Sequence, residues 1–344
     1  MTIRRVFSGI AALTVFCFLV GAQTSDTLRG GGATFPAPIY QKWIQSFEMS
    51  SHGLAISYEP VGSEEGIRRL RAGAVDFAAS DILPNEQLQD QFGILALPSV
   101  VGAVVPAYNI QGLVHDLRFT PELLAEIFLG HITKWNDPRI KEINRGVNLP
   151  AADIVVVHRS DGSGTTYVLS EYLSKTSAAW REAMGTGSTL HWLTGQAAQG
   201  NGGVAGTLSR TPYSIGYLEF IYALRNELSY GAVKNAAGRF VRPDIDSITA
   251  AARRAKPAED FRISLADAAG RDDYPIASFT WLLVSSKMPA GPKRQRLAAF
   301  LDWAFSVGQR EAGALGYVAL PEELASQERS AAARLWEAGP RPAN

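Results

Sequence analysis

Cysteine is almost absent from this chain of 344 residues, which contains only Cys17. Cys17 lies in an apolar stretch near the N-terminus and follows Phe16, whereas a lipid-modified cysteine normally follows a small residue at the cleavage point. Removal of that stretch leaves no cysteine, which excludes disulfides, thiolate catalysis and cysteine metal sites. The stability of the remaining chain must therefore come from packing.

An excess of charge of one sign is also missing. The chain has 33 basic and 33 acidic residues. Without Arg4 and Arg5, which lie in the N-terminal segment, 31 basic residues remain against 33 acidic ones, a net charge of about −2. Nothing global attracts a polyanion, so we expect no nucleic-acid partner.

The apolar run near the N-terminus, residues 6–20, is shorter than the roughly 20 residues of a membrane span. It follows two arginines and precedes the small residues Gly21 and Ala22. This pattern predicts a cleavable secretory signal over residues 1–22, with the mature chain starting near Gln23. A retained membrane anchor is the alternative.

Apolar patterning predicts an α/β fold. Short apolar runs at 103–108, 154–157 and 281–284 are typical of buried strands, and helical spacing of apolar residues occurs at 39–47 and 165–173. A chain of this length favours two domains.

No internal repeat or low-complexity run interrupts this pattern. The most polar, proline-bearing parts are residues 241–257, which resemble a linker, and the tail after Pro321, for which we expect an alanine-rich helix.

A glycine-rich segment joins a predicted strand to a predicted helix. It reads His158-Arg159-Ser160-Asp161-Gly162-Ser163-Gly164-Thr165-Thr166. Such a junction offers free backbone N–H groups and the positive end of a helix dipole, which together bind anions. Arg159 adds a planar set of donors for an oxyanion, Asp161 can orient that guanidinium, and Ser163 and Thr165 add hydroxyl groups. For Ser163 alone, simple capping of the helix is an equal alternative.

Three further segments end in loops that can reach a ligand. The glycine-rich stretch 30–38 feeds a helix and offers Thr34 and Phe35 as donors, unless Thr34 merely caps that helix. Ser63 stands at another helix start, where it can cap, bind a ligand, or do both.

Asp81 ends the fourth segment, an apolar stretch followed by small residues. A carboxylate in an anion site is repulsive unless the ligand carries a proton to donate, as phosphate does at neutral pH and sulfate does not. Asp81 would then select phosphate. The alternative is an exposed acid in a turn.

Taken together, these segments resemble the periplasmic phosphate-binding protein of the bacterial phosphate (Pst-type) ABC transporter. In that family a Thr-Phe pair after a glycine loop, a serine at a helix start, an aspartate and an Arg-x-Asp-Gly-Ser-Gly-Thr run hold the anion. The matching residues are Thr34, Phe35, Ser63, Asp81, Arg159, Asp161, Ser163, Gly164 and Thr165. Further similarity at 185–189, 215–217, 274–276, 302–304 and 320–321 extends the likeness over nearly the whole mature chain.

The resemblance implies a two-lobed periplasmic binding protein fold of type II, with the ligand in the interlobe cleft and the chain crossing twice. Residues 23–104 and 277–344 would form lobe I, and residues 105–276 lobe II. It also implies a periplasmic monomer, peripheral to the membrane and without a lipid anchor. This monomer would close over inorganic phosphate and deliver it to permease subunits driven by a cytoplasmic ATPase, with no cofactor, no metal and no catalysis.

Two features depart from the family pattern. Glu64 and Glu65 stand where the family usually has small residues, and His158 replaces a common arginine. Each carboxylate would cost roughly 2 kcal/mol if it faced the anion from about 8 Å. Arg68 and Arg69 are candidate helical partners, so we expect weakened affinity or a changed docking rim with binding retained.

Three alternatives stay open on the sequence. An enzyme would use Ser163 as nucleophile with one of the five histidines, His52, His115, His131, His158 or His191, although no known nucleophile or metal-protease motif occurs. A binding protein for another oxyanion would keep the fold but not the selectivity of Asp81. A scaffold or adhesion protein would reuse the fold without a ligand.

Overall fold

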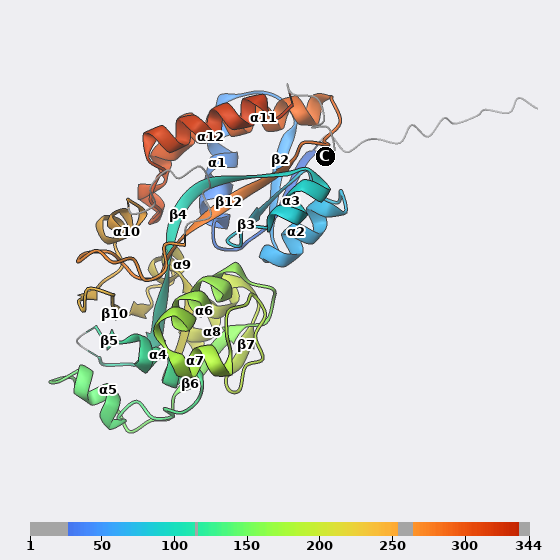
Figure 1. Cartoon of the computed structure of the whole chain (residues 1–344). Coiled ribbons are helices and arrows are strands. Elements are labelled where there is room, and N and C mark those ends of the chain that lie inside the picture. The colour runs from blue at the N-terminus through green and yellow to red at the C-terminus, as the bar shows by residue number, and fades with distance from the viewer. Residues whose placement is uncertain (1–26, 114–115, 254–263, 337–344) are drawn as a thin grey trace, which may run out of the picture.

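The computed structural model describes residues 27–113, 116–253 and 264–336. The predicted signal segment 1–22 and the expected start near Gln23 lie outside the described residues. Figure 1 shows two lobes, one above the other, with each lobe built from strands covered by helices. This arrangement confirms the predicted α/β class.

The larger sheet has the strand order β2-β1-β3-β12-β4-β8-β6-β7, with β9 also paired to β4. A smaller sheet has the order β11-β10-β5. The strands are β1 (Thr27–Gly32), β2 (Ala55–Pro60), β3 (Phe77–Ser80), β4 (Ile94–Asn109), β5 (Arg118–Phe119), β6 (Val155–Arg159), β7 (Gln196–Ala198), β8 (Ser214–Glu219), β9 (Ser229–Tyr230), β10 (Ala232–Lys234), β11 (Phe240–Val241) and β12 (Ala277–Ser285).

Helices pack against the strands of the larger sheet. The helices are α1 (Ala37–Ser50), α2 (Ser63–Arg71), α3 (Glu86–Phe92), α4 (Pro121–Phe128), α5 (Pro138–Ile143), α6 (Gly164–Thr176), α7 (Ala178–Ala183), α8 (Gly200–Arg210), α9 (Phe220–Arg225), α10 (Ile245–Ala252), α11 (Pro292–Ser306) and α12 (Glu322–Arg334), with short 3₁₀ turns η1 (Gly308–Glu311) and η2 (Gly313–Leu315).

The long strand β4 belongs to both lobes. Residues 94–103 pair antiparallel with β12, and residues 104–109 pair antiparallel with β8. In Figure 1, β4 runs from the upper lobe, which carries α1, α2, α3, α11 and α12, into the lower lobe, which carries α4, α6, α7 and α8. One continuous strand therefore pairs with the sheets of both lobes.

Local sequence explains why the helices begin where they do. Prolines at the start of α1, α4, α5 and α11 supply the backbone angle of a first helical turn without needing a hydrogen-bond partner. The apolar stripe of α1 buries Trp43 and Phe47, and Phe47 packs against Phe300 of α11 with ring centroids 5.5 Å apart. The predicted helices at 39–47 and 165–173 correspond to α1 and α6.

Residues 241–257 were expected to resemble a linker, and this expectation is wrong for their central part, which forms α10. Asp244 caps the helix by accepting from the Ser247 N–H at 2.7 Å, while the Ser247 hydroxyl accepts from the Asp244 N–H at 3.0 Å. Ile248 and Ala251 are then fully buried. The polar residues that suggest a linker are thus a capping box. The expected alanine-rich helix of the tail is present as α12.

Within the three described ranges, no helix is both long and apolar enough to cross a membrane.

Candidate functional site

Arg159 is the last residue of β6 and lies almost completely buried at the boundary between the lobes. Its Nε donates to Asp161 Oδ1 at 2.7 Å, Nη2 donates to Asp161 Oδ2, and Nη1 donates to Thr165 Oγ1 at 3.2 Å. These contacts use three of the five guanidinium N–H donors, so two remain for a ligand. Burial alone raises the pKa of Asp161, but Arg159 outweighs this effect and holds the pKa below its usual range. The pair is therefore a fixed ion pair with spare donors.

The loop after Arg159 turns directly into the first turn of α6. Ser163 caps this helix, because its Oγ accepts from the Thr166 N–H at 3.1 Å. Its own N–H donates to the carbonyl of Ser188 at 3.0 Å. Within the described part of the chain, the N–H groups of Gly164 and Thr165 have no protein acceptor. Two backbone donors at the positive end of a helix are thus available to an anion.

The glycine loop of the other lobe offers a second pair of donors. β1 ends at Gly32, whose φ of 145° and contact with Ala79 leave no room for a side chain. The chain then turns through Thr34 and Phe35 into α1. In the described ranges neither backbone N–H has a protein acceptor. Phe35 is fully buried, and its carbonyl accepts from the Tyr317 hydroxyl at 2.6 Å, so its N–H is held in place.

Ser63 and Asp81 lie side by side at the same boundary. Ser63 begins α2, and its hydroxyl accepts from the Asp81 N–H at 3.3 Å. Asp81 follows β3 and is 2% exposed, so the alternative of an exposed turn acid is wrong. Burial raises the pKa of Asp81 to about 7, although the hydrogen bond from Thr280 at 2.7 Å and the charge of Arg159 lower it. When the buried carboxyl group of Asp81 is ionised, a partner that donates a hydrogen bond therefore stabilises it.

The two sets of residues meet through Gly164. A methyl group in place of its hydrogen would lie 2.4 Å from Asp81 Oδ2 and 2.5 Å from Ser63 Oγ. Only glycine therefore allows this approach of α6 to the other lobe. The predicted residues with polar side chains that face the boundary are at most 6% exposed: Thr34, Ser63, Asp81, Arg159, Ser163 and Thr165. The structure brings the predicted site residues together in a closed cleft.

Asn201 is a central residue of the site that the sequence analysis missed. It lies in the first turn of α8 and is fully buried. Its Nδ2 donates to Thr34 Oγ1 at 2.9 Å and to Thr165 Oγ1 at 3.1 Å, while its Oδ1 accepts from the Glu219 N–H at 3.0 Å. Asn201 therefore links a predicted residue of each lobe, and it leaves the Thr34 hydroxyl proton available to a ligand. The glycines at 200, 202 and 203 were the only signal near it.

The two glutamates that depart from the family pattern have different partners, and neither is hydrogen-bonded to a predicted site residue in the described ranges. Glu65 binds Arg68 through Nε at 2.6 Å and Arg69 through Nε at 2.7 Å, and these bonds lower the pKa of Glu65 to about 2. Arg68 and Arg69, the candidate helical partners of the two glutamates, therefore both bind Glu65 rather than Glu64. Glu64 instead accepts a hydrogen bond from the Ser188 hydroxyl across the cleft. His158, the other departure, stacks on Trp192 with centroids 4.8 Å apart.

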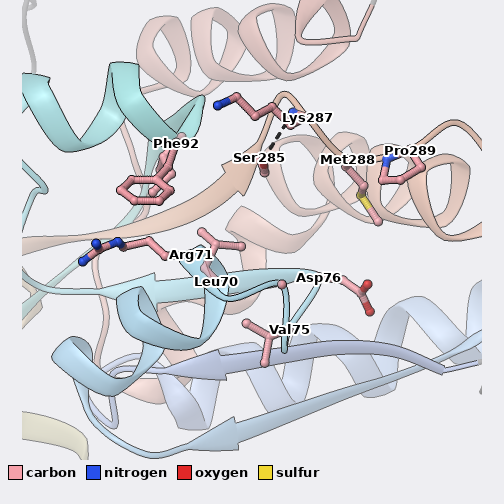
Figure 2. Close-up of a pocket in the computed structure, with 11 residues that line it drawn as sticks. Leu70, Arg71, Val75, Asp76, Phe92, Ser285, Lys287, Met288 and Pro289 are labelled. Carbon is pink, nitrogen blue, oxygen red and sulfur yellow. Dashed lines mark hydrogen bonds between the residues drawn. The ribbon is translucent and has the colours of Figure 1, made fainter.

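A separate hollow lies between the C-terminal ends of α2, α3 and β12 (Figure 2), and no predicted site residue lines it. Arg71 lies over the ring of Phe92 at 4.3 Å, and Lys287 is tethered to the carbonyl of Gln91 at 2.8 Å. Asp76 is engaged by Lys293 and by the Arg29 N–H. The charged groups around this hollow already have partners within the protein.

The described residues contain no cluster of three or more side chains suited to a metal ion. Of the histidines considered as a catalytic base, His115 lies outside the described residues. Among those described, none hydrogen-bonds to Ser163, and the His158 ring faces the Arg159 carbonyl at 3.1 Å. A serine without a base or an orienting group lacks the arrangement of nucleophilic catalysis.

Comparison with known proteins identifies the class to which this fold and cleft belong. A family model described as a PBP superfamily domain matches residues 20–308. A solved structure of a putative phosphate ABC transporter substrate-binding protein from Clostridium perfringens, with bound phosphate, superposes with a TM-score of 0.64. The two sequences are 17% identical, and the match covers 86% of this chain and all of that one, which supports the fold alone. The two-lobed periplasmic binding fold is therefore confirmed.

Closer relatives narrow the assignment. The phosphate-binding protein PstS of Pasteurella multocida is 40% identical over 319 residues, which cover 91% of this chain and 92% of the relative. PstS of Haemophilus influenzae is 40% identical over 309 residues, covering 89% and 92%. The chain belongs to the PBP superfamily and, within it, to the family of these PstS proteins, as the resemblance predicts. This is a family of substrate-binding proteins.

Proposed function

We propose that this protein binds inorganic phosphate in the interlobe cleft and delivers it to an ABC importer. The observation that carries the proposal is the set of donors left without a protein acceptor around Arg159 and Asp81. They come from both lobes: the N–H groups of Thr34 and Phe35 from one, and those of Gly164 and Thr165 with two guanidinium N–H groups from the other. An anion with four oxygens can accept from all of them.

The hydroxyl groups complete the set of donors. Thr34 Oγ1 accepts twice from Asn201, and Ser163 Oγ accepts from the Thr166 N–H. Each oxygen is held by these bonds, while its own proton points to no protein acceptor in the described ranges. We assign phosphate binding to Thr34, Phe35, Ser63, Asp81, Arg159, Ser163, Gly164 and Thr165, with Asp161 orienting Arg159.

Asp81 sets the selectivity in this proposal. Above its pKa of about 7 the carboxylate accepts a hydrogen bond, and phosphate still carries a proton that it can donate. Sulfate carries none, so its oxygens would meet the carboxylate without a shared proton. Within a buried site that repulsion is only weakly screened. We therefore propose phosphate rather than sulfate or another fully ionised oxyanion as the ligand.

Closure of the lobes accounts for capture and release. We place lobe I at residues 23–104 and 277–344 and lobe II at residues 105–276. Phosphate that touches both lobes stabilises the closed form relative to an open one. Opening would separate Asp81 and Ser63 from Gly164 and expose the ligand.

The cellular setting follows from family membership and the N-terminal segment. We propose a periplasmic monomer, secreted by a cleavable signal at residues 1–22 and without a lipid anchor, that docks on permease subunits driven by a cytoplasmic ATPase. We also propose that it catalyses no reaction on phosphate, since Ser163 serves as a helix cap and has no base among the described residues.

Equilibrium dialysis of protein freed of bound phosphate tests the proposal. The unmodified chain is expected to retain about one labelled phosphate per molecule, because the closed cleft has a single site. Arg159→Lys should weaken binding by at least about tenfold, since lysine cannot keep both bonds to Asp161 and still face the anion. Absence of phosphate binding by the unmodified chain, or full binding by Arg159→Lys, would contradict the assignment.

A further inference from the structure

At the mouth of the cleft the backbones of the two lobes come into direct contact. The first turn of α2, from Gly62 to Glu64, lies against the loop before α6, and the Glu64 N–H donates to the Gly162 carbonyl at 3.2 Å. A methyl group on Gly62 would lie 2.7 Å from Asp161 Oδ2. A methyl group on Gly162 would lie 2.3 Å from the Glu64 carboxylate. Glycines on both sides therefore allow direct contact.

One pair of side chains crosses this contact. The carboxylate of Glu64 accepts a hydrogen bond from the hydroxyl of Ser188, which lies in the loop between α7 and β7. A hydrogen bond to an ionised group is stronger than one between neutral groups. Its partners are 124 residues apart in sequence and belong to different lobes, so the bond exists only when the lobes are closed.

Ser188 is also connected to the anion site itself. Its carbonyl accepts the N–H of Ser163, the residue that caps α6 and contributes a hydroxyl to the proposed phosphate site. A contact made by Ser188 is therefore connected, through this bond, to the loop before α6 that is proposed to bind the anion. Glu64 is exposed at the cleft mouth, whereas the neighbouring Glu65 is engaged by Arg68 and Arg69 of its own helix. Of the two glutamates, only Glu64 forms a hydrogen bond to the opposite lobe.

We infer that Glu64 and Ser188 form an interlobe latch that closes the mouth of the cleft and slows the release of phosphate. The inference rests on the proposed function, since it assigns the latch to the release of that ligand. The latch is separate from the phosphate contacts, because neither Glu64 nor Ser188 is among the residues proposed to bind the anion. It acts by favouring the closed state, and therefore changes dissociation more than association.

Stopped-flow kinetics of phosphate release tests the latch. Glu64→Ala and Ser188→Ala should each raise the dissociation rate by about five- to twentyfold, with the association rate changed less than about twofold. The double variant should release phosphate no faster than either single variant, because both remove the same bond. Glu64→Gln should retain most of the slow release seen in the unmodified protein, since the glutamine amide oxygen can still accept a hydrogen bond from Ser188.

Glu65→Ala is the matched control, because it removes the same charge from the same helix but breaks only contacts within that helix. Its dissociation rate should equal that of the unmodified protein. Equal rates for Glu64→Ala and the unmodified protein, equal effects of Glu64→Ala and Glu65→Ala, or additive effects of the two latch variants would each overturn the latch while leaving phosphate binding intact. An unmodified protein that binds no phosphate would overturn the proposed function and the latch together.

Discussion

Asp81 and Arg159 bring opposite charges to one buried site. Arg159 is neutralised on one side by Asp161 and keeps two donors for a ligand. Asp81 receives one hydrogen bond from Thr280 and has a pKa of about 7 because of its burial. Both side chains stand at the end of a strand, where the next residues turn into the cleft. In the proposed function, Arg159 attracts an oxyanion and Asp81 favours an oxyanion that carries a proton.

The raised pKa of Asp81 predicts how the stability of the ligand-free protein depends on pH. Between about pH 4 and pH 7 the folded state keeps a proton on Asp81 that the unfolded state has lost, so this group lowers stability as the pH rises. The penalty is complete above pH 7. Asp81→Asn removes it and should stabilise the ligand-free protein at pH 8 by up to about 4 kcal/mol, with little difference at pH 4.

Urea unfolding of the two proteins at pH 4, 6 and 8 in phosphate-free buffer measures this difference. The asparagine variant removes the titration of Asp81 and leaves the other buried acids in place. One of these is Glu219, whose pKa is raised mainly by burial and also by the charge of Asp81. A difference in unfolding free energy that stays constant over this range would show that Asp81 titrates normally.

At the scale of elements, strand-to-helix junctions were readable from sequence. The loop before α6 and the loop before α1 combine glycines, a capping or turn residue and a following apolar stripe, so their donors were predicted. Asn201, Tyr317 and Ser188 were not predicted. Their contacts join residues 282 apart for Phe35 and Tyr317 and 167 apart for Thr34 and Asn201, and no local pattern encodes such pairs. The role of Glu64 depended on the same kind of long-range contact.

Ser163 caps α6, and in the proposed function it also binds the ligand; the two roles can be separated by measurement. Ser163→Ala removes the acceptor for the Thr166 N–H and should lower stability by about 1 kcal/mol. It should also weaken phosphate binding by about tenfold or more, because a hydroxyl donor to an anion is lost. Thermal unfolding and calorimetric titration measure the two effects.

Asn85→Ala is the matched control for this prediction. Asn85 caps α3 in the same way, accepting from the Leu88 N–H at 2.9 Å, but it is exposed, whereas Ser163 is fully buried. It should cost a similar amount of stability and leave phosphate affinity unchanged. Equal affinities for Ser163→Ala and Asn85→Ala would mean that Ser163 is only a helix cap.

At the scale of the whole molecule, β4 joins the two lobes, which in the proposed function open and close around the ligand. Residues on either side of the cleft supply the donors, and Gly164 lets the lobes approach until Ser63 and Asp81 contact α6. The α/β class and the joining of the four segments were predictable, since they follow from periodicity and family resemblance. The degree of closure was not, because it depends on how side chains from the two lobes fit together.

Calorimetric titration of the ligand-free protein with phosphate and with sulfate at pH 8 tests the central claim most directly. At this pH Asp81 is mostly ionised in the ligand-free protein, so a bound anion must donate a hydrogen bond to its carboxylate. We predict tight binding of phosphate with one site per chain, and sulfate binding weaker by at least about a thousandfold, in the range seen when a site built for a hydrogen bond meets a ligand that cannot make it. Comparable affinities for the two anions, or no heat of binding with phosphate, would contradict the account.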